Sequence, residues 1–177
     1  CKGTIIPDGV TSIGSYAFEG CTGLTSIEFP SSVTSIGSSA FEGCTGLTSI
    51  EIPSSVTSIG YEAFSGCTGL ASIKIPSSVT CIDDRAFYGC TGLASIDIPN
   101  SLTRIGSDAF NGTSWYERQP DGVVYLDNWV YTYKGYMPAN TKIRLKDGII
   151  GIADAAFSYC YENLIFIEIP SSVISIG

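Results

Sequence analysis

The sequence predicts a solenoid, a stack of short units in which each unit covers the apolar surface of the next. The main observation is a 23-residue period, which places cysteines at Cys21, Cys44, Cys67 and Cys90. Proline and phenylalanine recur at the same interval, and the consensus unit reads C-T-G-L-T-S-I-E-I-P-S-S-V-T-S-I-G-S-S-A-F-E-G. Repeats of about 20 to 50 residues are typical of solenoids, because one unit alone buries too little apolar surface to fold. We call each unit a rung.

The first half of a rung predicts a β-strand. In residues 21–43, Leu24, Ile27 and Phe29 are apolar, and Ile27 and Phe29 are two residues apart. Alternate residues of a strand share a face, so both side chains are expected to point inward. Pro30 should end the strand because proline lacks a backbone donor.

The second half of a rung predicts a turn that leads to the next rung. Val33 and Ile36 form a second apolar pair, which indicates another short strand. Ala40 and Phe41 are expected in a short helical or 3₁₀ turn. Gly43 follows, and glycine is the residue that most often ends such a turn in the left-handed conformation.

The period is broken once, by 24 residues, before I-R-L-K-D-G-I-I-G-I-A-D-A-A-F restores it. The inserted stretch V-V-Y-L-D-N-W-V-Y-T-Y predicts two strands joined by a tight turn at Asp127 and Asn128. We therefore expect repeats over 1–112, an irregular aromatic hairpin insert over 113–142 and resumed repeats over 143–177, all within one solenoid domain.

The composition argues against several classes of function. Histidine is absent, which removes Ser-His-Asp and Cys-His catalysis and histidine-ligated metal sites. The net charge of −8 argues against nucleic acid as a partner. Carboxylates and hydroxyls are abundant but fall on repeat positions, so we expect no enzyme activity, no cofactor and no metal. The chain begins and ends inside a repeat, which indicates a piece of a longer protein.

The cysteines predict a buried ladder rather than disulfides. Five of the seven, Cys160 included, occupy one repeat position and should form an in-register column. Their parallel side-chain directions disfavour disulfide geometry, and free cysteine is among the most buried residue types. Cys1 and Cys81 lie off this column, and Cys81 is expected to be more exposed.

The outer side of the first strand is one candidate binding surface, because solenoids commonly bind partners along such a face. The candidate residues, which we call the strand face, are Thr25, Ser26, Glu28, Thr48, Ser49, Glu51, Ser72, Lys74, Ser95 and Asp97. The alternative is a merely solvated polar face, which the strict repetition favours.

The hairpin insert is a second candidate. Residues 115–136 hold both tryptophans and five of the ten tyrosines. Residues 113–146 carry five Lys or Arg against three acids, whereas the rest of the chain carries four against fourteen. Clustered Trp, Tyr and Arg are typical of interface hot spots and sugar-stacking platforms. The candidate residues are Trp115, Tyr116, Arg118 and Tyr136.

The alternative is that the aromatic residues of the insert pack on the solenoid, because an isolated hairpin is too small to be stable. Strand alternation places Trp129, Tyr131 and Tyr133 on one face, which is expected to be the packed one. Trp115, Tyr116 and Tyr136 are expected to be less constrained.

The rung G-L-T-S-I-E-I-P-S-S-V-T-S-I-G-S-S-A-F-E-G-C resembles the BspA-like (bacterial surface antigen A type) leucine-rich repeat family. The segment W-Y-E-R-Q-P-D-G-V-V-Y-L-D-N-W-V-Y-T-Y-K-G resembles the hairpin unit that interrupts such arrays. The resemblance implies a right-handed, curved leucine-rich repeat solenoid with a β-strand and a short helical or 3₁₀ turn per rung. It also implies a secreted or surface-attached protein without common catalytic residues, which adheres to host matrix proteins, host cells or other bacteria.

Together these observations predict an extracellular or cell-surface module for adhesion or protein binding. The expected partner is a host or bacterial surface protein, with extracellular matrix proteins among the candidates. Two alternatives stay open, a structural spacer in a larger protein and a glycan-binding module. The chain itself is expected to be an elongated monomer.

Overall fold

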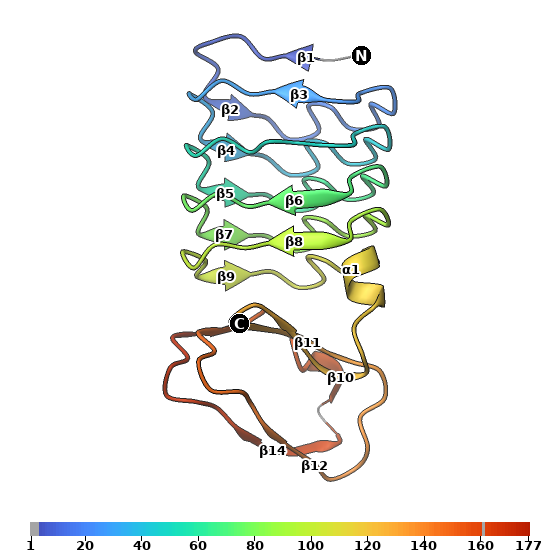
Figure 1. Cartoon of the computed structure of the whole chain (residues 1–177), viewed down its shortest axis with the longest axis vertical. Coiled ribbons are helices and arrows are strands. Elements are labelled where there is room, and N and C mark those ends of the chain that lie inside the picture. Colours follow the sequence, from blue (N-terminus) through green and yellow to red (C-terminus); the bar gives the residue numbers. More distant parts are fainter. Residues whose placement is uncertain (1–3, 161) are drawn as a thin grey trace.

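Each 23-residue unit folds into one turn of a β-solenoid, and about 7 turns stack along one axis (Figure 1). The computed structural model describes residues 4–160 and 162–177. The sequence prediction of a stacked repeat array is therefore confirmed, with few helices and short strands.

The first strand of the rungs lies on the side facing the viewer in Figure 1. It comprises β1 (Thr4–Ile5), β3 (Ile27–Glu28), β6 (Ser72–Lys74) and β8 (Ser95–Asp97). The pairs β1–β3 and β6–β8 are parallel and in register, with Ile73 opposite Ile96 and Lys74 opposite Asp97. Ile27 and Ile73 point into the core, and the polar residues beside them are exposed.

The second strand forms a five-stranded parallel sheet. Its members are β2 (Ser12–Ile13), β4 (Ser35–Ile36), β5 (Ser58–Ile59), β7 (Cys81–Ile82) and β9 (Arg104–Ile105). The buried isoleucines pair in register, as in Ile36 opposite Ile59. The short second strand that Val33 and Ile36 predicted is thus confirmed.

The segment expected to be a helical turn is instead a series of turns joined by bonds three residues apart. Ala40 N donates to Gly37 O and Glu42 N donates to Ser39 O. Ser39, between them, has a φ of 51°, so a continuous helix cannot form there. Among the described residues only η1 (Ser158–Cys160) is a 3₁₀ helix. The predicted left-handed stop is confirmed, since Gly43 has a φ of 69°.

A column of phenylalanine rings runs through the core. The ring centroids of Phe41 and Phe64 are 5.2 Å apart with nearly parallel planes, and Phe64 and Phe87 are 5.3 Å apart. The column ends at Phe110, whose ring meets Trp115 edge-on at 6.2 Å. Each ring therefore covers the next, and the insert covers the last one.

The cysteine ladder is buried beside this column, as predicted. The thiols of Cys44, Cys67 and Cys90 donate to backbone carbonyls at 3.0–3.1 Å. The acceptors are Phe18, Phe41 and Phe64, which each lie 26 residues earlier. Cys160 is also buried, and Cys21 and Cys81 are half-buried. All six of these thiols are free; Cys1 lies outside the described residues.

The insert begins with α1 (Ser114–Glu117) and continues with the antiparallel hairpin β10 (Gly122–Leu126) and β11 (Trp129–Lys134). Asp127 in the hairpin turn has a φ of 49°, as a two-residue turn requires. The hairpin predicted around Asp127 and Asn128 is confirmed.

The chain then returns to the array. β11 pairs with β13 (Gly151–Ile152), which pairs with β15 (Ser175–Ile176), and both pairs are parallel. β12 (Thr141–Arg144) pairs with β14 (Leu164–Glu168). The hairpin thus extends the solenoid and does not project from it, as Figure 1 shows.

Candidate functional site

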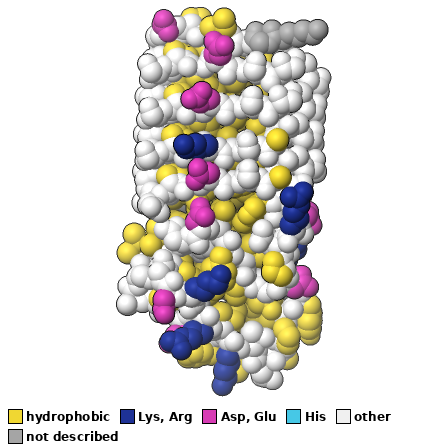
Figure 2. Space-filling view, viewed as in Figure 1, with side chains coloured by type: hydrophobic (Ala, Val, Ile, Leu, Met, Phe, Trp, Pro, Cys, Tyr) yellow, Lys and Arg dark blue, Asp and Glu magenta, His cyan; other side chains and the backbone are white. Residues whose placement is uncertain are grey.

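The strand face is solvent-exposed along its whole length. All ten predicted residues, from Thr25 to Asp97, have exposed side chains. Figure 2 shows acidic groups in a line along this face, interrupted by a cation. The charged residues of this line are Glu28, Glu51, Lys74 and Asp97. Rung stacking therefore brings the predicted residues together into one surface.

Two shallow grooves cross this face between the rungs. One groove, of about 430 Å³, is lined by Ile50, Glu51 and Lys74. The neighbouring groove is lined by Glu28, Phe29 and Glu51. Phe29 and Ile50 are half-buried apolar side chains that the sequence argument did not assign to the surface. The apolar residues that flank Glu28 in the sequence could have predicted apolar contact area on this surface.

The insert residues do not form one exposed site. The Trp115 ring lies 5.7 Å from the Tyr131 ring and edge-on to Phe110, and Tyr116 also packs against Tyr131. The prediction that Trp115 and Tyr116 are less constrained is wrong, because the exposed end of the phenylalanine column needs a cover. Arg118 is exposed and Tyr136 is 80% exposed.

The expectation that three aromatic residues of β11 share one packed face is confirmed for two of them. Trp129 and Tyr131 are buried in the main core. Tyr133 is half-buried and packs with Tyr125 against a second core cluster. The difference arises because the hairpin register shifts between Val124 and Tyr125, a β-bulge that changes the alternation of β11 before Tyr133.

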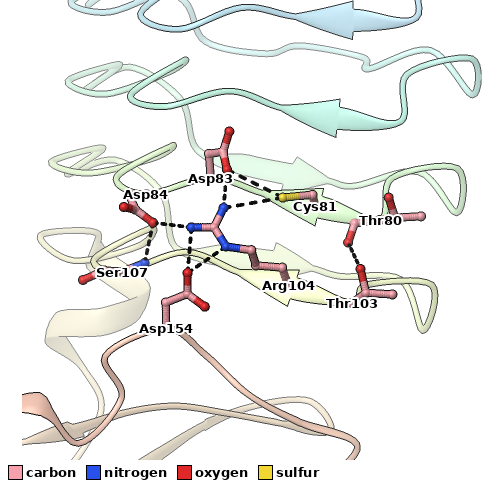
Figure 3. A network of polar contacts seen from close by, with 8 residues as sticks. All are labelled: Thr80, Cys81, Asp83, Asp84, Thr103, Arg104, Ser107 and Asp154. Carbon is pink, nitrogen blue, oxygen red and sulfur yellow. Dashed lines mark hydrogen bonds and ion pairs between the residues drawn. The ribbon is translucent and has the colours of Figure 1, made fainter. Parts of the chain in front are cut away.

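An ion cluster that the sequence argument missed joins the regular array to the resumed repeats. Arg104 Nε donates to Asp154 Oδ2 at 2.7 Å, and its Nη atoms contact Asp83 and Asp84 (Figure 3). Burial opposes the charge of Arg104, but hydrogen bonds to Cys81, Asp154 and Asp83 hold its pKa above the usual value.

Asp83 and Asp84 stand where the other regular rungs have Gly followed by Ser or Tyr. Asp84 Oδ1 accepts from Ser107 N at 3.1 Å, in the following rung. Both carboxylates also pair with Arg104, which neutralises them. Within residues 4–160 and 162–177, no three metal-ligating side chains come together as an ion site. In the same described ranges, no helix has the length and apolar character needed to cross a membrane.

A family model, the BspA type leucine rich repeat region, matches residues 1–116 and 130–177 in six copies. The chain belongs to the BspA-type leucine-rich repeat family. The stretch between the two matched blocks contains β10 and the hairpin turn. The resemblance seen in the rung sequence is thus confirmed.

Solved structures of bacterial leucine-rich repeat proteins share the fold. A protein from Bacteroides ovatus is 33% identical over 99% of this chain, with a TM-score of 0.66. The leucine-rich repeat protein of T. pallidum is 32% identical over 99% of this chain and 72% of its own, with a TM-score of 0.67. A leucine rich cell surface protein from Faecalibacterium prausnitzii is 42% identical over 64% of this chain and 30% of its own, with a TM-score of 0.62.

The chain spans 39% of the length of the B. ovatus protein. A search of the curated proteins finds no match. The BspA-type repeats therefore establish the fold and the family, and the binding properties have to be argued from the surface of this chain.

Proposed function

We propose that this BspA-type array is a non-catalytic module for protein binding or adhesion in a secreted or cell-surface protein. The observation that carries the proposal is the strand face, an exposed surface of equivalent rung positions with grooves between its rungs. The name of the F. prausnitzii relative, a leucine rich cell surface protein, supports the location.

The chemistry of the strand face favours a partner with basic and apolar side chains. Glu28, Glu51 and Asp97 give the face an acidic character, and Lys74 is its one cationic side chain. The half-buried Phe29 and Ile50 supply apolar contact area inside the grooves. An apolar centre with a charged rim is the usual anatomy of a protein interface.

We propose a host or bacterial surface protein as the partner, with extracellular matrix proteins as the first candidates. Biolayer interferometry of the intact chain on immobilised collagen, laminin and fibronectin, and on whole bacterial cells, tests this. The informative variant is Glu28→Lys/Glu51→Lys, which reverses two charges in adjacent rungs of the strand face.

The matched control is Glu19→Lys/Glu42→Lys, which makes the same change in adjacent rungs on the turn side. We expect the strand-face variant to lose binding and the control to retain it. Equal loss in both variants would show only a long-range charge effect. Absence of binding to every protein and cell tested would favour the structural spacer that the uniform rungs also fit.

A further inference from the structure

The hairpin insert opens a crevice between the last regular turn of the array and the first turn after the insert. At the corner before these turns, Asp154 N donates to Ile105 O at 2.9 Å, and Arg104 pairs with Asp154. Ala153, which matches Asp83 in the repeat, donates its N–H to Val130 O of β11, as Asp83 N does to Ile59 O in the regular rungs. The resumed rung is therefore joined to β9 at this corner, but β13 stacks on β11.

Beyond this corner the two turns separate, because β11 lies between them. Phe110 N in the upper turn donates to the Tyr131 hydroxyl, and Tyr133 N donates to Ala156 O in the lower turn, both at 2.8 Å. β11 does not repeat the path of a rung turn, so the space between the two turns is filled incompletely. A crevice of about 110 Å³ remains, which is open to solvent and has room inside for several waters or for part of a small ligand.

Tyrosine side chains line this crevice from three elements. Tyr116 comes from α1, Tyr133 from β11 and Tyr159 from η1. Tyr116 and Tyr133 are half-buried, and Tyr159 is 91% exposed. The crevice thus has an aromatic lining. One of its tyrosines, Tyr159, makes few contacts with the rest of the fold.

Polar groups form another part of the lining. Asn111 Nδ2 donates to Asp108 Oδ1, and Asn111 Oδ1 accepts from the Tyr131 hydroxyl at 2.8 Å. These bonds fix Asp108 and Asn111 in place while leaving lone pairs of the Asp108 carboxylate for another donor. Asp154 lies on the opposite side, already paired with Arg104.

The broken repeat also frees a backbone donor in the crevice. In each earlier rung the equivalent N–H donates to the next turn, as Glu62 N does to Asp84 O and Arg85 N does to Ser107 O. Within the part of the chain that the structure describes, Asp108 N has no such acceptor, and neither does Gly112 N. The crevice therefore combines a backbone donor, carboxylate and amide groups, and aromatic rings.

We propose that this crevice binds one pyranose ring of a neutral saccharide. The apolar C–H face of a pyranose packs on a tyrosine ring, while its hydroxyls pair with planar carboxylate and amide groups. An anionic sugar is disfavoured by Asp108. A cation is disfavoured because Lys134 Nζ already lies 4.9 Å from the Tyr116 ring centroid, and Arg104 already neutralises Asp154. This site is separate from the strand face and does not depend on the proposed protein binding.

Titration of the full ¹⁵N-labelled chain with methyl β-D-glucopyranoside, methyl β-D-galactopyranoside and N-acetylglucosamine tests the proposal. We expect the amide signals of Asp108 and Gly112 to shift with at least one of these sugars. Tyr159→Ala should weaken that binding about tenfold, and it should fold because the side chain is almost fully exposed. Tyr88→Ala, which removes an exposed tyrosine of the regular array outside the crevice lining, is the control and should bind normally.

The proposal is overturned if none of the sugars shifts these amides, or if Tyr159→Ala and Tyr88→Ala bind equally well. Shifts confined to the strand face would place saccharide binding there instead. A parallel titration with tetramethylammonium tests whether the crevice binds an organic cation instead of a saccharide. Shifts of Asp108 and Gly112 with this cation, but not with the sugars, would identify an aromatic cation site and overturn the saccharide assignment.

Discussion

The hydroxyl of Tyr131 takes the place of a missing rung, because it accepts the hydrogen bond of Phe110 N at 2.8 Å. In the preceding rungs the equivalent donor pairs with a carbonyl of the next turn, as Phe87 N does with Ala109 O. Tyr131 is buried in the main core, and burial raises the pKa of its hydroxyl, which therefore stays protonated and donates in turn to Asn111.

Tyr131→Phe should therefore lower the free energy of unfolding by about 1–3 kcal/mol, because it leaves the buried N–H of Phe110 without a partner. Urea unfolding followed by far-UV circular dichroism measures this. Tyr88→Phe removes a hydroxyl from a tyrosine that is 44% exposed and should change stability little. Equal, small effects in both variants would show that Tyr131 acts by packing alone.

The buried cysteine ladder predicts a loss of stability at alkaline pH. Burial raises the pKa of the Cys44 thiol to about 11, against the opposing hydrogen bond from the Cys21 backbone. In the unfolded chain the thiol ionises near its ordinary pKa of 9.0, so the folded state holds the proton more tightly. The stabilisation is complete below that value and is lost as the pH rises to about 11, at roughly 1.4 kcal/mol per pH unit.

Urea unfolding at several pH values between neutrality and pH 10.5 measures this loss. Cys44→Ala should be less stable than the parent at neutral pH, by about 1–2 kcal/mol, because it leaves a small cavity. The difference should shrink as the pH rises, since the variant has no thiol to ionise, and the tyrosines titrate alike in both chains. If the free energies of unfolding of the parent and the variant fall in parallel with pH, Cys44 does not contribute to the loss of stability at alkaline pH.

The close stacking of rungs makes one glycine position intolerant of a side chain. A Cβ on Gly69 would lie 2.6 Å from Thr45 O in the preceding rung, and Gly46 and Gly92 are equally crowded by backbone oxygens. Gly69→Ala should destabilise the array by about 1–3 kcal/mol through overpacking. Gly14→Ala is the control, since nothing lies within 4 Å of its Cβ and its φ is not positive. Thermal unfolding of both variants shows whether the destabilisation comes from the close spacing of the rungs or from the replacement of any glycine.

The regular rungs could be predicted from sequence because their period fixes both the neighbours and the inward face. The residues equivalent to Ile27 and Phe41 recur at equal intervals, so a single stacked arrangement buries all of them in the same way. The same period places Glu51 and Lys74 on a common outer face. Local turn chemistry likewise revealed the hairpin, since Asp127 and Asn128 lie between two apolar strands.

The parts that could not be predicted involve contacts across the insert. Arg104 and Asp154 are 50 residues apart, and their pairing depends on how the chain returns to β9 after the hairpin. Trp115 and Tyr116 looked free because no repeat constrains them. A usable signal existed: the phenylalanine column must end somewhere, and these aromatic residues follow Phe110 within six positions.

The Arg104 ion cluster predicts an electrostatic link between the regular array and the resumed repeats. Arg104→Ala leaves Asp83, Asp84 and Asp154 close together without a cation, and we expect a loss of about 1 kcal/mol in the free energy of unfolding. The side chains are partly exposed, so salt should screen both the attraction in the parent and the repulsion in the variant. The difference between the two proteins should therefore diminish as sodium chloride rises.

A double-mutant cycle with Asp154→Ala separates the link across the insert from the pairs within the array. If Arg104 and Asp154 are coupled, the double variant should lose less stability than the sum of the two single variants. Arg85→Ala is a suitable control, because Arg85 pairs with Glu62 on the surface of the regular array alone. Additive losses for Arg104 and Asp154 would mean that stacking of β11 and β13, and not this ion pair, joins the two parts of the solenoid.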